Sequence, residues 1–214
     1  MIMTAIITVI AAYLIGSVSF AVIFSAVFIK KDVRNLGSGN AGTTNMMRVA
    51  GFLPGALTFI CDALKGFVAC YIGRLIFEYA YTQTQSVWLH SSVGVYLCGL
   101  ACMLGHMYPI FFGFKGGKGV ATSVGIYAVC CPIAIVSGLI VFAVSTIISK
   151  IVSLSSLLAT VTVVTLSLIF YDKGGIFAVQ AVLSIAMGGL VFFKHRENIV
   201  RLINGNENKI GRRK

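Results

Sequence analysis

The chain has 214 residues, of which 58% are hydrophobic and 11% charged, and its mean hydropathy is +0.96. Soluble domains carry about 25% charged residues, so this composition excludes an ordinary soluble globular protein. The net charge of +11 does not require nucleic acid as a partner, because cytoplasmic loops and anionic lipid headgroups explain basic residues in a membrane protein. We predict an all-α integral membrane protein with one polytopic domain over residues 1–214.

Apolar runs alternate with short polar stretches along the first third of the chain. Residues 3–29 predict one transmembrane helix, residues 51–77 a second, and residues 78–85 a polar turn. Asp62 and Lys65 interrupt the second run three positions apart, so they share a helix face and can pair. We assign this pair a structural role, although a role in a site fits the spacing equally well.

The middle of the chain predicts a third span over residues 88–112, with His106 near its end. His106 is placed to cap that span or to orient the loop that follows. Residues 120–131 and 133–148 predict two short helices that turn at Pro132, because twelve residues rising about 1.5 Å each do not cross a hydrocarbon core of about 30 Å. Two further apolar runs end near residues 170 and 193.

Counting these runs gives seven spans and places four polar segments on one face of the membrane. They hold 14 of the 17 basic residues and comprise residues 30–50, 113–119, 149–154 and the tail from residue 194. The positive-inside rule then puts this face in the cytoplasm, with the N-terminus outside and the C-terminus cytoplasmic. Six spans, with residues 120–148 as one, would move Ser153 and the tail to the other side, so the charge distribution favours seven.

The first polar segment, residues 37–48, is glycine-rich and has no acidic side chain. Its G-x-G-x-x-G pattern indicates a dinucleotide site only after a β-strand, and here the flanks are membrane helices. Its glycines let backbone N–H groups converge on an anion, and Arg48 adds a planar fork suited to phosphate or carboxylate. Small neutral donors accompany them: Ser38, Asn40, Thr43, Thr44 and Asn45. The alternative is an ordinary polar connector.

Three further polar stretches contain candidate anion ligands. The run Lys115, Gly116, Gly117, Lys118 and Gly119 lacks the P-loop pattern but can cradle phosphate at a helix start, or simply touch lipid phosphates. Ser153 and Ser156 lie at the start of the next-to-last span, where serine often acts only as an N-cap. His195 and Asn198, three apart, would share a helix face.

Standard nucleophiles and bases are missing from these segments. The chain has no G-x-S-x-G elbow and no His-x4-Asp pattern, and its six cysteines all lie in apolar runs, where thiols act as small hydrophobes. No cysteine and histidine spacing predicts a metal site. A site rich in anion donors and poor in bases fits a phosphate-bearing substrate close to the lipid.

Three stretches together resemble the acyl-phosphate-dependent glycerol-3-phosphate acyltransferases of bacterial membranes. They are GSGNAGTTNMMR at 37–48, GHMYPIFFGFKGGKGVAT at 105–122 and HRENIVRLINGNEN at 195–208. The order, spacing and hydropathy match over essentially the whole chain, and DALKG at 62–66 matches the second span. Three positions depart from the pattern: Ser19 stands where proline is expected, Ala21 where glycine is expected, and Lys150 where arginine is common.

The resemblance implies transfer of an acyl group from acyl-phosphate to the 1-hydroxyl of sn-glycerol 3-phosphate at the bacterial inner membrane, without metal or organic cofactor. By motif position it implies that Ser38 and Arg48 are critical, that Lys115, Lys118 and their glycines bind phosphate, and that His195 and Asn198 hold glycerol phosphate. Glu207 matches an acid to which we assign a structural role. His195 remains either a ligand or a general base. A transporter for a phosphate-bearing solute and a purely structural membrane protein are the other possible functions.

Overall fold

The computed structural model describes residues 1–174 and 176–211, and this part of the chain contains helices and no β-strand. Only helices and closed barrels satisfy every backbone polar group inside a bilayer, so the apolar runs become helices. The α-helices are α1 (Ile2–Gly16), α2 (Phe20–Ile29), α3 (Thr43–Ala50), α4 (Phe52–Thr84), α5 (Ser91–Met107), α6 (Val120–Cys130), α7 (Pro132–Ser149), α8 (Val152–Ile169), α9 (Phe177–Lys194) and α10 (Arg196–Ile203).

Within the described residues, six helical runs are long and apolar enough to cross a membrane. They are Ile2–Ile29, Phe52–Thr84, Ser91–Phe112, Pro132–Ser149, Val152–Ile169 and Phe177–Lys194. The seventh apolar helix, α6, is shorter, at 11 residues. The predicted break between α6 and α7 is confirmed, because α6 ends at Cys130 and α7 begins at Pro132. The count of seven spans stays a prediction.

The prediction of one continuous helix over residues 3–29 is wrong, because the helix is interrupted between Gly16 and Phe20. The break occurs although Ser19 is not a proline. Lys65 Nζ, from α4, donates to the carbonyl oxygen of Val18 at 2.8 Å and so satisfies a backbone acceptor that a continuous helix would have used. A tertiary contact therefore stabilises a bend that the local sequence does not announce.

The polar turn expected over residues 78–85 is also wrong, because α4 continues to Thr84. None of these residues is a glycine or proline, so the polar side chains lengthen the helix instead of ending it. The helix ends where Gln85 adopts a left-handed conformation with φ of 54°. At about 1.5 Å per residue, α4 is about 50 Å long and extends beyond a bilayer core of about 30 Å.

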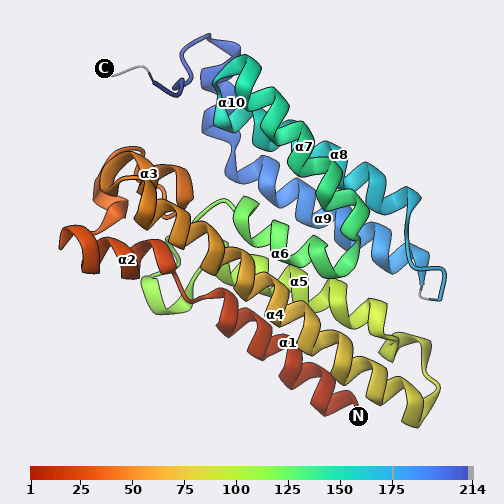
Figure 1. Ribbon diagram of the computed structural model, residues 1–214. Helices are drawn as coiled ribbons and strands as arrows, with labels where there is room; N and C mark the ends of the chain where they lie inside the picture. The colour runs from red at the N-terminus through yellow and green to blue at the C-terminus, as the bar shows by residue number, and fades with distance from the viewer. Residues whose placement is uncertain (175, 212–214) are drawn as a thin grey trace.

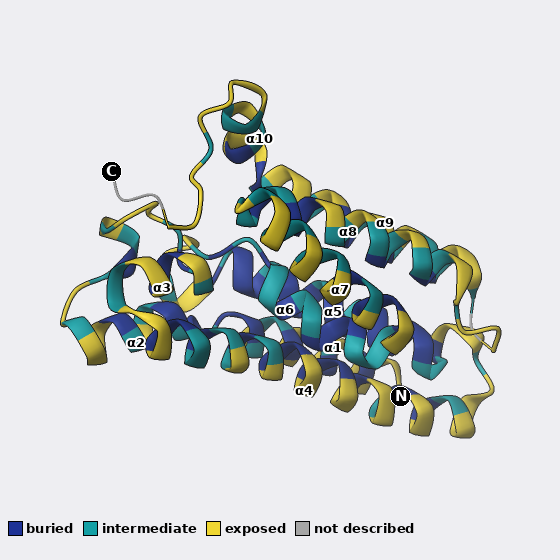
Figure 2. Ribbon diagram, turned by 45° about the horizontal axis from the view of Figure 1, so that its top comes forward, coloured by how far each residue is buried: buried dark blue, intermediate teal, exposed yellow. Residues whose placement is uncertain are grey.

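Helix α5 lies at the centre of the bundle and is mostly buried, whereas the outward faces of the surrounding helices are exposed and apolar (Figures 1 and 2). Helices α1, α4 and α6 pack around α5, and α7, α8 and α9 form a second group beside them. Gly66 and Gly125 let α4 and α6 approach closely, since a Cβ atom at either position would collide with the backbone of the other helix.

The polar segments gather at one end of this bundle (Figure 1). Residues 30–50, the loop before α6, the turn between α7 and α8, and α10 all lie there, while the N-terminus and the turns that follow α4, α6 and α8 lie at the opposite end. The main chain of Ile210 donates to the carbonyl of Lys150 at 2.8 Å, which joins the tail to the α7–α8 turn. The bundle thus brings together the segments that the sequence analysis singled out.

Candidate active site

Asn45 shapes the first polar segment, residues 37–48, from inside. Its side chain is buried; Oδ1 accepts the N–H of Ser38 at 2.9 Å, while Nδ2 lies 2.9–3.1 Å from three loop carbonyl oxygens, those of Val33, Leu36 and Asn40. Gly37 and Gly39 have φ of 58° and 71°, the left-handed region that glycine tolerates best. The amide of Asn45 is therefore occupied by the loop, and Ser38 is left exposed.

Helix α3 begins inside this segment, with Gly42 as its N-cap. The hydroxyl oxygen of Thr43 is buried and has no hydrogen-bond partner among the described residues. Thr44 and Arg48 are exposed, and Asn40 is half-buried. Neutral donors lie at the start of this short helix and Arg48 lies in its last turn, so the segment carries a positive charge and no acidic side chain, which favours an anion over a cation.

Asp32 and Arg34 precede the first segment and connect it to Phe112, just before the second segment, residues 115–119, a connection that the sequence analysis missed. Arg34 pairs with both carboxylate oxygens of Asp32 at 2.7–3.1 Å, and its Nη1 donates to the carbonyl of Phe112 at 2.6 Å. The hydrogen bonds from Arg34 lower the pKa of the Asp32 carboxyl. The available signal was that Asp32 is the only acid among residues 30–50.

The second segment packs against His106. The N–H of Gly117 donates to the carbonyl oxygen of His106 at 3.1 Å, and a Cβ atom at Gly117 would collide with the His106 ring and the Ala41 carbonyl. Gly119, with φ of 85°, is the N-cap of α6. Of the two interpretations of His106, the contacts match the one in which it orients this loop.

Lys115 and Lys118 have different surroundings. Lys115 is exposed and lines an open polar cleft with Arg34 and Gly39 of the first segment. Lys118 is half-buried, and its Nζ donates to Oδ1 of Asn198. Burial, reinforced by the charge of Arg201, lowers the pKa of Lys118 to about 8. The positive charge of Arg48 contributes to the same lowering of the Lys118 pKa, so the two cations lie within electrostatic range of each other.

Asn198 belongs to a hydrogen-bonded chain that runs through α10. Its Nδ2 donates to Oε1 of Glu207 at 3.0 Å, and Nε of Arg201 donates to Oε2 of Glu207 at 2.9 Å. These bonds agree with the structural role assigned to Glu207, which orients the amide that faces Lys118. The sequence analysis did not predict that Arg201 belongs to this series of hydrogen bonds. Its spacing of three from Asn198 on one helix was the signal available.

His195, between α9 and α10, is 3% exposed, and its Nδ1 lies 2.8 Å from the carbonyl oxygen of Val191. A carbonyl only accepts, so Nδ1 carries the proton and Nε2 of the neutral ring offers a lone pair. Burial, together with the positive charge of Lys118, lowers the pKa of His195 to about 4. His195 is therefore a neutral hydrogen-bond acceptor near pH 7.

The two serines of the third segment, residues 150–156, differ in availability. Ser156 donates its hydroxyl to the carbonyl of Val152 at 2.9 Å, within its own helix. The hydroxyl oxygen of Ser153 is buried and has no hydrogen-bond partner among the described residues. No hydrogen bond between described side chains joins Ser153 to Lys118 or His195, so Ser153 lies outside their network.

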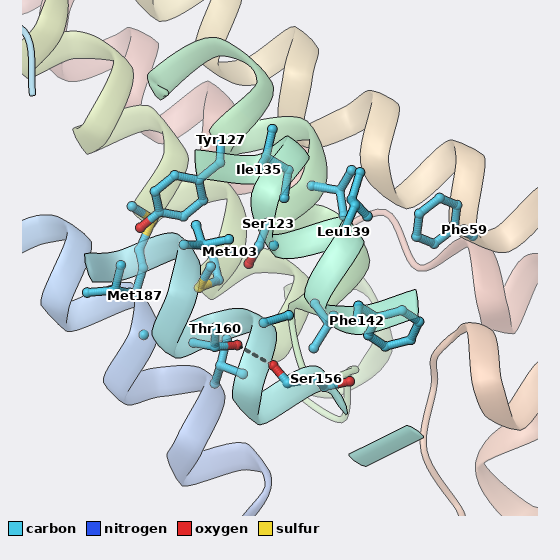
Figure 3. Close-up of a pocket in the computed structure, with 18 residues that line it drawn as sticks. Phe59, Met103, Ser123, Tyr127, Ile135, Leu139, Phe142, Ser156, Thr160 and Met187 are labelled. Carbon is cyan, nitrogen blue, oxygen red and sulfur yellow. Dashed lines mark hydrogen bonds between the residues drawn. The ribbon is translucent and has the colours of Figure 1, made fainter. Parts of the chain in front are cut away.

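The bundle contains an apolar cavity, shown in Figure 3. Val120, which follows Gly119, and Val191, whose carbonyl binds His195, are among its lining residues. Side chains from α4 to α9 complete the wall, and those labelled in the close-up are Phe59, Met103, Ser123, Tyr127, Ile135, Leu139, Phe142, Ser156, Thr160 and Met187. Fold and site together define an integral membrane protein with a polar, basic end and an apolar cavity.

Comparisons with known proteins name the family. The family model described as glycerol-3-phosphate acyltransferase matches residues 6–205. Glycerol-3-phosphate acyltransferase 2 of Bacillus anthracis is 42% identical over 96% of this chain and 98% of its own length, and the Finegoldia magna enzyme is 38% identical over 95% and 94%. The chain belongs to the glycerol-3-phosphate acyltransferase family, and is therefore an acyltransferase of phospholipid synthesis.

Two solved structures have the same fold. The crystal structure of PlsY, an integral membrane glycerol 3-phosphate acyltransferase, in its glycerol 3-phosphate form has a TM-score of 0.80 and 37% identity, covering 97% of this chain and 96% of that one. Its lysophosphatidic acid form has a TM-score of 0.78 and 36% identity, covering 97% and 95%.

Proposed function

We propose that this protein transfers a fatty acyl group from acyl-phosphate to the 1-hydroxyl of sn-glycerol 3-phosphate, releasing lysophosphatidic acid and phosphate. The observation that carries the proposal is the position of Lys118 and His195. Both lie at the polar end of the bundle and close to the lining of an apolar cavity, because Lys118 lies two positions before Val120 and His195 contacts the carbonyl of Val191. A water-soluble phosphate and a fatty chain can meet there.

Glycerol 3-phosphate is held, in this proposal, by the cationic side of the site. Lys118 and Arg48 attract the phosphate, and Asn198 orients Lys118 through its amide oxygen. His195 accepts a hydrogen bond from a glycerol hydroxyl at Nε2. The structural relative has a crystal structure in a glycerol 3-phosphate form, which supports an acceptor of this kind.

The acyl-phosphate is bound by two regions with opposite chemistry. Its fatty chain enters the cavity between α6, α7 and α8, whose wall is almost wholly apolar (Figure 3). Its phosphate faces Lys115 and the glycines Gly116, Gly117 and Gly119, with Ser153 as an additional donor. Burying a fatty chain in an apolar site contributes about 0.8 kcal/mol per CH₂ group, so a chain of many CH₂ groups anchors the donor.

The first segment acts on the reacting carbonyl. Ser38 and the amides near Gly37, Gly39, Thr43 and Thr44 stabilise the negative charge that develops on the carbonyl oxygen, because donors fixed in advance need no rearrangement during reaction. Asn40 supplies a further polar group, and Asn45 acts by keeping the loop in shape. Phosphate is a good leaving group whose oxygen can take the hydroxyl proton, so no protein base is required. The glycerol hydroxyl attacks the acyl carbonyl directly as the bond to phosphate breaks, so no covalent acyl-enzyme forms.

The proposal includes the orientation of the protein. Its active end faces the cytoplasm of a bacterial cell, in the inner membrane, with the N-terminus outside, the C-terminus inside and seven spans. The basic residues support this arrangement, because 14 of the 17 lie in the segments at the active end. Cysteine labelling of position 86 and position 150 in intact and permeabilised cells tests it. Label reaching position 150 in intact cells would contradict it.

Purified protein incubated with acyl-phosphate and glycerol 3-phosphate tests the reaction directly. We expect release of inorganic phosphate that depends on both substrates, together with one equivalent of lysophosphatidic acid. Acyl-CoA replaces acyl-phosphate in a parallel reaction and is expected to give no product. Product formed from acyl-CoA and not from acyl-phosphate would reject the donor while leaving the family assignment intact.

The titration of Lys118 predicts the pH dependence. Lys118 is charged below its lowered pKa of about 8, so kcat/KM for glycerol 3-phosphate is expected to fall as the pH rises through 8. His195, with a pKa of about 4, adds no ascending limb between pH 6.5 and 9.5. Bound phosphate raises the pKa of Lys118, so kcat should fall at a higher pH than kcat/KM. Profiles of both parameters check this. A residual activity of Lys118→Arg without the descending limb assigns the limb to Lys118, whereas an unchanged limb in this variant contradicts the assignment.

His195→Gln separates binding from base catalysis. Glutamine can place an acceptor oxygen near the position of Nε2 but cannot take the proton. Because His195 is a neutral acceptor of weak basicity, we expect KM for glycerol 3-phosphate to rise about 10-fold with the single-turnover rate at saturation nearly unchanged. A fall of about 10²-fold or more in that rate would instead assign general base catalysis to His195.

A further inference from the structure

A buried cluster of three ionisable side chains lies beneath the site and is not used by the proposed chemistry. Nζ of Lys65 lies 2.8 Å from Oδ1 of Asp62, and Nδ1 of His106 lies 3.5 Å from the same oxygen. The side chains of Asp62, Lys65 and His106 are only 1%, 3% and 6% exposed. Asp62 and Lys65 come from α4 and His106 from α5, so the cluster joins two helices.

The contacts of Lys65 account for its own presence. Besides Asp62, its ammonium donates to the carbonyl of Val18 at 2.8 Å and lies 5.8 Å from the ring centre of Phe20. Burying charge in a membrane is costly unless the charge is paired. Lys65 is paired, and it stabilises the break between α1 and α2. No comparable explanation covers His106, because a leucine could fill the same space without needing Asp62.

On the side away from Asp62, His106 faces the second segment. Its carbonyl oxygen accepts the N–H of Gly117 at 3.1 Å, and its Nε2 lies so close to Gly117 that a Cβ atom there would collide with it. The same Cβ atom would meet the carbonyl of Ala41 in the first segment. The imidazole therefore lies between the Asp62 carboxylate below and the point where the first and second segments meet above.

We propose that His106, oriented by Asp62, is a positioning residue that fixes the position of Gly117 and thereby that of Lys118. Oδ1 of Asp62 lies 3.5 Å from Nδ1, and this electrostatic contact favours the ring orientation that leaves Nε2 against the loop. Lys118 follows Gly117 directly, so a displacement of Gly117 moves the ammonium group of Lys118. His106 touches no substrate. This inference rests on the proposed function only for its kinetic readout.

A double-mutant cycle between His106 and Gly117 tests whether the His106 side chain positions Gly117. Gly117 does not have a left-handed φ, so alanine is compatible with its backbone, and the strain of Gly117→Ala comes from the collisions alone. His106→Asn keeps a donor for Asp62 and makes room for the new methyl group. We expect kcat/KM for glycerol 3-phosphate to fall about 30-fold in Gly117→Ala and about 5-fold in His106→Asn. The double variant should lose less than the product of the two.

A matched pair of neutral variants tests the orientation by Asp62. Asp62→Asn with Lys65→Met keeps an oxygen acceptor for Nδ1, whereas Asp62→Leu with Lys65→Met removes it, and both lose the same contact to Val18. We expect glycerol 3-phosphate affinity about 10-fold weaker in the leucine variant than in the asparagine variant, with equal thermal midpoints in detergent. This comparison remains informative even if Gly117→Ala does not fold.

Binding of glycerol 3-phosphate measured by calorimetry separates this inference from the proposed reaction. If wild-type protein releases no phosphate from acyl-phosphate, the reaction is wrong, yet the cycle can still be measured by affinity. Multiplicative losses in the cycle, or equal affinities in the matched pair, would overturn the positioning role.

Discussion

Lys118→Met is expected to lower kcat/KM for glycerol 3-phosphate about 10³-fold. The variant removes the cation that donates to Asn198 and lies two positions before Val120, a residue that lines the apolar cavity. A charge-assisted bond to phosphate in a partly buried site is stronger than one in water, and its loss leaves Asn198 and the substrate phosphate without their partner. The measurement is steady-state phosphate release at varied acceptor concentration.

Lys173→Met is the matched control for this variant. Lys173 carries the same side chain in the turn after α8, at the end of the bundle opposite the site. It should retain wild-type kinetics. A loss of less than about 10-fold in Lys118→Met, with a larger loss in Lys115→Met, would move the phosphate site to the open cleft beside Arg34.

Ser38→Ala is expected to lower kcat by about 10²- to 10³-fold with little change in either KM. The loop around Ser38 is fixed by Asn45 and by two glycines in the left-handed region, while the serine hydroxyl stays exposed. A donor held in this way acts mainly on the charge that develops in the transition state, and removal of one such donor from an oxyanion site costs an amount of this size. Single-turnover measurements at saturating substrates give the chemical step.

Ser86→Ala is the control for this second variant, because Ser86 lies in the turn between α4 and α5 at the opposite end of the bundle. Its kcat should equal that of the wild type. If Ser38→Ala instead raises KM for one substrate and leaves the chemical step intact, Ser38 is a binding residue and the oxyanion assignment is wrong.

Hydropathy predicted most of the fold, because a bilayer leaves an apolar run few alternatives to a helix. Two local features escaped it. The break between Gly16 and Phe20 depends on Lys65, which lies 47 positions after Val18 in the sequence. The extension of α4 to Thr84 was missed because polar residues were taken to mark a turn, although none of them disfavours a helix.

Part of the site was similarly accessible. The residue types of the first, second and fourth segments pointed to an anion, and charge placed them on one side of the membrane. The sequence could not distinguish Lys115 from Lys118 or Ser153 from Ser156, because each pair has the same chemistry a few positions apart. Burial and partners separate them: Lys118 has Asn198 as its partner, and Ser153 keeps a hydroxyl that its own helix does not use.

The sequence by itself determined that this is a helical membrane protein, predicted that its polar segments bind phosphate, and indicated an acyltransferase family through its motifs. Composition, charge asymmetry and short motifs are local properties, so a single chain suffices to recognise them. Only the tertiary structure decided that Asn45 shapes its loop, that His195 is held neutral, and that His106 lies between Asp62 and Gly117. These properties depend on which side chains distant in sequence share a buried space, and helix packing alone creates that space.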